Sequence, residues 1–310
     1  MKTKIMRLYI IGKHLWENLW SVQRDQLSKG WSRLVRDTRI VVVTLHNYNQ
    51  QKIGFQTCAL SFQCAVALIP MLAILFAVTG GFGLSDPLKY LLYEKIPAEP
   101  ELIDMIMLAA ENIVDAAQSG LFGVISVLTF IWAILWLFMR VEEVFNNVWN
   151  VKKAKRNIFK RIGVDIMIML TIPMVIVIFF AGQVVYSHVL DVLIPDVGDI
   201  TSHLKNFLNW AILAGVVVMT LSSMYKFIPA TKVHYRYALK SALIAGIIFT
   251  GLQYLYLETQ VMVTTMNAFY GTVAAVPLFL IWLNYSWQII LYGAQFSYAF
   301  QKVDEIESKI

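Results

Sequence analysis

The sequence predicts an all-α, polytopic membrane protein with six transmembrane helices, both termini cytoplasmic, an N-terminal amphipathic helix and a helical outer loop. Three observations predict this class. The 310 residues are 58% hydrophobic and only 15% charged, whereas a soluble domain is roughly 45–50% apolar and about 25% charged. Several apolar stretches are long enough to cross a bilayer, and the basic residues gather on one side of them. This composition excludes a disordered chain, a coiled coil and an ordinary soluble enzyme.

A transmembrane helix needs about 20 mostly apolar residues. Together the predicted spans form one transmembrane domain over 57–300. The fifth is interrupted by Gln253, Tyr254 and Tyr256, but it is still predicted to span. An even number of spans puts both termini on one side of the membrane. The predicted spans are 57–84, 121–149, 162–190, 204–228, 239–262 and 273–300.

The distribution of Lys and Arg predicts which side that is. Of the 26 basic residues, 22 lie in four segments that the spans put on the same side. The opposite loops carry ten acidic residues. The positive-inside rule therefore puts both termini in the cytoplasm, and it explains the net charge of +6 without a nucleic-acid patch. The four basic segments are 1–56, 150–161, 226–240 and the tail 301–310.

Two segments outside the spans are amphipathic. Residues 5–22 carry Trp16 and Trp20 on an apolar side, with basic residues opposite, and open an interfacial basic arm over 1–56. This helix either lies on the cytoplasmic leaflet or packs on the end of the bundle. The long loop 85–120 predicts a helical cap on the outer face. Its acidic face is either solvated or a vestibule for cations.

Polar residues align along five of the six spans, although polar groups at membrane depth normally face a bundle interior or a wet cavity. The stripes either hold the helices together by hydrogen bonds or line a central polar cavity. Glu143 follows Arg140 by three residues, which favours an ion pair on one helix face. The residues expected to line a substrate path are Gln63, Arg140, Glu143, Asn147, Asp165, Gln183, Gln253, Gln260, Asn267, Asn284, Gln288 and Gln295.

Several short motifs carry a resemblance to a known family. They include the run Tyr270–Pro277, the run Leu291-Tyr292-Gly293-Ala294-Gln295, and Tyr225, Pro229 and Thr231 before the fifth span. With Asn147 and Trp149, they make residues 50–300 similar to the YihY/BrkB family of bacterial inner-membrane proteins. Gln295 stands where that family usually has Glu.

The resemblance implies a location in the bacterial inner (plasma) membrane, and the family was historically labelled ribonuclease BN. The residues do not favour that label. A zinc-dependent nuclease needs clustered ligands, but the five His residues form no ligand motif and fall on both sides of the membrane. The two cysteines, Cys58 and Cys64, have no metal-type spacing. We therefore expect no enzyme activity, no catalytic residue, no metal and no cofactor.

Two functions stay open. The first is a transporter or flippase that moves a lipid-like or anionic amphiphilic substrate through a polar intramembrane cavity. The second is a non-transporting scaffold in envelope assembly, with the arm and the outer loop as partner surfaces. We expect membrane lipid as a partner, envelope proteins for a scaffold, and no nucleic acid; the sequence predicts no oligomeric state. The basic rim expected to collect anionic head groups is Lys152, Lys153, Arg156, Lys232 and Arg236.

Overall fold

The computed structural model describes residues 28–81, 121–151, 199–264 and 268–307, with Trp20, Asp104, Leu108 and Asn112. These residues contain helices and short turns and no strand, so the predicted all-helical class is confirmed for this part of the chain. The long helices are α2 (Lys29–Gln50), α3 (Ile53–Gly81), α6 (Leu121–Val148), α8 (Asp199–Phe227), α9 (Tyr235–Thr264) and α10 (Ala268–Glu307).

Several predicted features fall outside the described residues. They are the helix 5–22 apart from Trp20, nearly all of the loop 85–120, the basic loop from residue 152 onward and the third predicted span. The other five predicted spans overlap α3, α6, α8, α9 and α10. Among the described residues, His203–Phe227 and Tyr235–Gln260 are long and apolar enough to cross a membrane, and Ile53–Leu68 is a shorter apolar helix.

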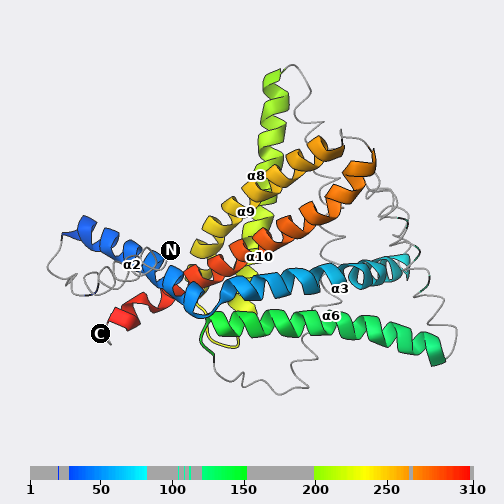
Figure 1. Ribbon diagram of the computed structural model, residues 1–310. Helices are drawn as coiled ribbons and strands as arrows, with labels where there is room; N and C mark the ends of the chain where they lie inside the picture. Colours follow the sequence, from blue (N-terminus) through cyan, green and yellow to red (C-terminus); the bar gives the residue numbers. More distant parts are fainter. Residues whose placement is uncertain are drawn as a thin grey trace, which may run out of the picture.

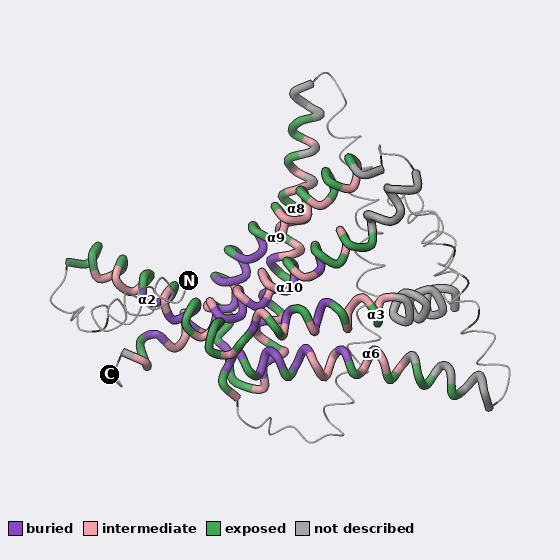
Figure 2. Tube along the Cα trace, viewed as in Figure 1, coloured by how far each residue is buried: buried purple, intermediate pink, exposed green. Residues whose placement is uncertain are grey.

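The helices meet at one end. There α3 starts, α6 and α8 finish, α9 starts, and α10 passes through (Figure 1). Buried residues concentrate at this end, whereas exposed residues increase along α8 and α9 away from it (Figure 2). We call the end the helix junction. Its main buried residues are Tyr48, Ile53, Phe145, Trp149, Tyr225, Val233, Leu291 and Ala294.

Away from the junction, large apolar side chains face outward. Phe207 is 69% exposed, Ile247 67% and Leu255 62%. Apolar surface of this extent is costly in water and marks a site of contact with a membrane or another protein. The exposed outer parts of α8 and α9 therefore suit a lipid environment.

Helix α10 connects the bundle to α2. Its 40 residues extend about 60 Å at 1.5 Å per residue, twice the roughly 30 Å of a hydrocarbon core. Its last turns pass the junction and pack against α2, where Ile40 and Val43 are buried with Ala299 and Val303. The predicted arm 1–56 thus contains a long helix, which the sequence reading did not identify. The chain turns from α2 into α3 at Lys52, whose φ of 50° is left-handed.

Among the described glycines, Gly293 of α10 has the least space around it. The Tyr225 hydroxyl of α8 occupies the space that a side chain at Gly293 would need. Ser241 of α9 donates a hydrogen bond to the carbonyl oxygen of Gly293. Ala245 and Ala294 are also buried here. Small residues allow transmembrane helix backbones to approach closely, so this contact joins α8, α9 and α10.

We predict that Gly293→Ala destabilises the protein by about 1–3 kcal/mol, the usual cost of overpacking a core. The new Cβ would lie 2.8 Å from Cβ of Ala245 and closer still to the Tyr225 hydroxyl. Adding Tyr225→Phe removes that hydroxyl and should recover part of the loss. Denaturant titration in mixed micelles measures the free energy of unfolding.

Gly251→Ala is the matched control, because a Cβ at Gly251 meets nothing within 4 Å. It should be neutral or stabilise the helix by up to about 1 kcal/mol, since Ala is the better helix former. Equal stability of the Gly293→Ala and Gly251→Ala proteins would contradict this view of the packing.

Candidate functional site

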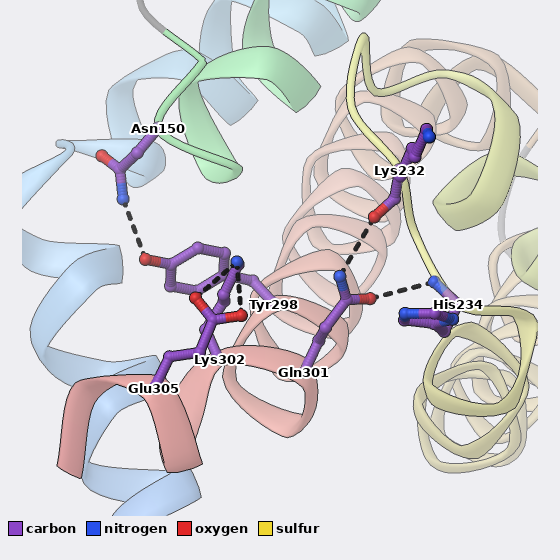
Figure 3. Close-up of polar contacts among 7 residues, drawn as sticks. All are labelled: Asn150, Lys232, His234, Tyr298, Gln301, Lys302 and Glu305. Atoms are coloured by element: carbon purple, nitrogen blue, oxygen red, sulfur yellow. Dashed lines mark hydrogen bonds and ion pairs between the residues drawn. The ribbon is translucent and has the colours of Figure 1, made fainter. Parts of the chain in front are cut away.

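A chain of side-chain amides crosses the helix junction. Gln295 Nε2 of α10 donates to Gln51 Oε1 at 2.6 Å, and Gln51 Nε2 donates to Asn150 Oδ1 at 3.2 Å. Asn150 Nδ2 lies 3.4 Å from the Tyr298 hydroxyl (Figure 3). We call these four residues the amide network. It links the turn between α2 and α3, the end of α6, and α10.

The geometry of the two turns positions this network. Asn150 has φ 54° directly after α6, and Asn adopts this left-handed conformation more readily than most residues. Gln51 is the C-cap of α2, and its backbone N–H donates to Asn47 O at 2.9 Å. Gln295 is fully buried, and within the described residues its Oε1 has no hydrogen-bond partner. The network is therefore anchored at its two turns by backbone geometry, and it has unused acceptor capacity at its buried end.

Aromatic rings flank the amide network. The rings of Tyr48 and Tyr292 stack with centroids 3.9 Å apart, and Trp149 packs edge-on against Tyr298 at 5.5 Å. Burial, and then the neighbouring Tyr292, raise the pKa of the Tyr48 phenol to about 12, so it is neutral at physiological pH. The amide network and the aromatic rings that flank it carry neutral side chains.

The loop between α8 and α9 is held from two sides. Asn146 of α6 is buried, and its Oδ1 accepts a hydrogen bond from Ala230 N at 2.7 Å. From α10, Gln301 Nε2 donates to Lys232 O at 3.0 Å, while its Oε1 accepts from His234 N at 2.9 Å (Figure 3). One amide side chain thus pairs with two backbone groups of the loop, and the loop is fixed to both α6 and α10.

A hollow of about 350 Å³ lies beside this loop. Lys232, a predicted rim residue, lines it and is exposed; Arg236, also predicted, is exposed in the first turn of α9. No carboxylate is among its lining residues, which are Lys226, Phe227, Pro229, Thr231, Lys232, Val233 and His234. We call it the loop hollow.

The predicted stripe of the last span faces α3 at two points. Gln295 reaches Gln51 just before α3, and Asn284 Nδ2 lies 3.4 Å from Sγ of Cys58 in α3. Between them, Gln288 Nε2 donates to Asn284 Oδ1 at 2.6 Å. Asn284 and Gln288 are half-buried, so they line the seam between α3 and α10 without being enclosed in it.

Other predicted path residues lie apart from this seam. The predicted ion pair forms, with Arg140 Nη1 2.7 Å from Glu143 Oε2, but Arg140 is only half-buried and Glu143 is exposed. Asn147 is exposed on α6. Gln260 Nε2 donates to the Tyr256 hydroxyl of its own helix at 2.6 Å. These contacts hold side chains locally and do not join the predicted residues into one continuous path.

The two remaining path residues of α3 and α9 are half-buried. Gln63 of α3 has a buried Oε1 with no hydrogen-bond partner among the described residues. Gln253 of α9 is half-buried. The predicted site residues outside the described part of the chain are Asp165, Gln183, Asn267, Lys152, Lys153 and Arg156.

Sequence reasoning missed three residues that organise the junction. Gln51 was placed in a basic arm, Gln301 in a tail, and Asn146 was passed over for its neighbour Asn147. The sequence marks these residues only weakly, because each is an uncharged amide near the end of a predicted span. Hydrogen bonds between residues 67 to 244 positions apart cannot be seen in local periodicity.

The described polar groups of the junction can bind by hydrogen bonding. Within the described residues, no group of three His, Cys, Asp or Glu side chains is placed to hold a metal ion. The two described cysteines are free thiols. The polar groups gathered at the junction and along α10 are chiefly amides, which donate and accept hydrogen bonds without changing charge.

Comparisons with known proteins identify relatives across most of the chain. The profile of the family described as "Virulence factor BrkB" matches residues 44–309. A UPF0761 membrane protein of Actinobacillus pleuropneumoniae is 22% identical over 82% of this chain and 90% of its own length. Another from Glaesserella parasuis is 26% identical over 71% of this chain and 75% of its own length. No solved structure matches significantly.

We predict that Gln295 and Gln51 are energetically coupled. Gln295→Leu and Gln51→Leu should each destabilise the protein by about 1–2 kcal/mol, because each leaves a polar partner unpaired. The double variant should lose less than the sum, by about 1 kcal/mol, in a double-mutant cycle of unfolding free energies. The control pair is Gln295→Leu with Gln253→Leu, which should be additive. Additivity of the first pair would refute the contact between the two amides.

We also predict that Asn146→Leu costs about 1–2 kcal/mol, since it removes the acceptor for the Ala230 N–H. Asn147→Leu, one residue along α6 at an exposed position, should change the unfolding free energy by less than about 0.5 kcal/mol. Thermal unfolding followed by Trp fluorescence compares the two variants. A larger loss at Asn147 than at Asn146 would be inconsistent with this role for Asn146.

Proposed function

The chain belongs to the BrkB family of membrane proteins, and on this premise we propose that it is a transporter or flippase of a lipid-like or anionic amphiphilic substrate. In this proposal it is a six-span protein of the bacterial inner membrane with both termini in the cytoplasm. The helix junction then lies at the cytoplasmic end, because the loop 226–240 and the tail 301–310 belong to the basic side of the sequence.

The observation that carries the proposal is the half-buried pair Asn284 and Gln288 on the α3 side of α10. Asn284 is eleven residues from Gln295 along α10, or about 16 Å. That is close to half of a hydrocarbon core of roughly 30 Å. Transporter binding sites lie near the bilayer midplane. In this proposal Gln295 marks the cytoplasmic edge of the hydrocarbon core, and Asn284 then lies near the depth expected for a substrate site.

The hydrogen bonding at this depth favours a binding seam over simple helix association. Amides that join helices usually bond across the interface. Asn284 makes one such contact, with Sγ of Cys58 in α3, whereas Gln288 bonds to Asn284 of its own helix. The buried Oε1 of Gln63 on α3 has no partner among the described residues. Polar capacity on both helices thus stays available to water or to a substrate head group.

The amide network has the properties of a closed cytoplasmic gate in this proposal. Each of its neutral hydrogen bonds contributes only about 0.5–1.5 kcal/mol net, so substrate binding energy is sufficient to separate them. The rim residues Lys232 and Arg236 lie beside this end and would collect anionic head groups from the inner leaflet.

A scaffold function is the second candidate, and the exposed face of α2 favours it. Trp31 is 65% exposed and Leu34 is 58% exposed. Both lie on α2, within the basic segment 1–56. An exposed apolar stripe beside basic residues suits a membrane surface or an envelope partner. A scaffold would need the α10 amides only for packing.

Reconstitution into liposomes tests the transport proposal. Asn284→Leu with Gln288→Leu should abolish movement of labelled lipid or anionic amphiphile while leaving the protein folded. Tyr285→Leu, on an exposed face of the same turn, is the control and should retain transport. No transport by the unmodified protein, or full transport by the double variant, would contradict the proposal; a scaffold should tolerate all three changes.

A further inference from the structure

We propose that the loop hollow is a binding site for a phosphate monoester or phosphate dianion. This inference rests on the proposed function, because it names the chemical class that the substrate presents to the cytoplasmic side. It adds a defined site, since the hollow is an open depression of about 350 Å³ lined by residues between Lys226 and His234.

The charge of the lining selects an anion. Lys226, Lys232 and His234 contribute basic side chains, and Thr231 contributes a hydroxyl that both donates and accepts. The sequence contains no Asp or Glu from residue 200 to residue 257. A small anion with several acceptor oxygens matches this set, and Lys commonly binds phosphate as a compact positive charge.

Carboxylates on the neighbouring turns of α10 already have cationic partners. Glu305 lies 2.7 Å from Lys302 Nζ (Figure 3). Asp304 lies 3.4 Å from Arg36. Neither is part of the lining of the hollow. The positive potential of the hollow is therefore not neutralised by an acidic side chain in its own lining.

The loop is fixed before any ligand binds. Lys226 Nζ donates to Val233 O, Gln301 holds the backbone at Lys232 and His234, and Asn146 holds Ala230. Lys226 has three N–H donors and uses one of them in this bond. Preorganisation of this kind improves affinity because the loop does not have to be ordered on binding.

Lys232 is the residue that tests the site most cleanly. Its side chain is exposed and lines the hollow, while its contact with Gln301 is made by the backbone carbonyl. Lys232→Gln therefore removes the charge and keeps the backbone contact. Lys240→Gln is the matched control, because Lys240 is also exposed, on α9, but is not part of the lining.

Isothermal titration of the full-length protein in a neutral maltoside detergent measures binding of inorganic phosphate and of dihexanoyl phosphatidic acid at constant ionic strength. Lys232→Gln should weaken both by at least about 10-fold, and Thr231→Val by about 3-fold. Lys240→Gln and the zwitterion dihexanoyl phosphatidylcholine should show no such effect. Tighter binding of phosphatidic acid assigns a lipid source to the ligand, whereas equal binding assigns a soluble phosphate ester.

Two results would overturn the inference: absence of phosphate binding, or an equal loss in the Lys232→Gln and Lys240→Gln proteins. Circular dichroism and unfolding midpoints ensure that the variants are folded. The outcome is separable from that of the transport assay. Lys232-dependent binding without transport supports the site and contradicts the transporter, whereas transport without such binding contradicts the site alone.

Discussion

The close approach of α8, α9 and α10 at Gly293 is the constraint on which the helix junction depends. Because Gly293 has no side chain, the Tyr225 hydroxyl of α8 and the Ser241 hydroxyl of α9 both reach the backbone of α10 there. This contact brings the end of α8 and the start of α9 beside the last turns of α10. The loop between them then lies within reach of Gln301 and Asn146.

Neutral polar groups then connect the packed core to the surface of the junction. A charged side chain enclosed at Gln295 would need a partner of opposite charge to offset its desolvation, whereas an amide needs only hydrogen bonds. Gln51 supplies one of them. The resulting contacts are individually weak and easily exchanged. A junction built this way can be well ordered and still open at a modest energetic cost, which is what a gate requires.

The sequence predicts the helical class and much of the polar stripe, but it does not predict the junction. Periodicity places Asn284, Gln288 and Gln295 on one face of a helix, and the structure turns that face towards α3. Charge patterning identifies Lys232 and Arg236 as a basic rim. The contacts of Gln51 with Gln295, and of Gln301 with the loop, join segments that are distant in the chain. Tertiary packing brings those segments together: Gly293 joins α10 to α8 and α9, and the stacked rings of Tyr48 and Tyr292 join α2 to α10.

Chemical accessibility of α10 tests the central claim most directly. In a protein with Cys58→Ala and Cys64→Ala, a single cysteine is introduced at Asn284, at Gln288 or, as a reference, at the exposed loop residue Thr231. A membrane-impermeant thiol reagent is applied to proteoliposomes with both faces accessible. If the seam between α3 and α10 is a wet substrate path, the cysteines at positions 284 and 288 react, and transported substrate slows the reaction. If only the cysteine at position 231 reacts until the protein is unfolded, the seam is dry and the path does not exist.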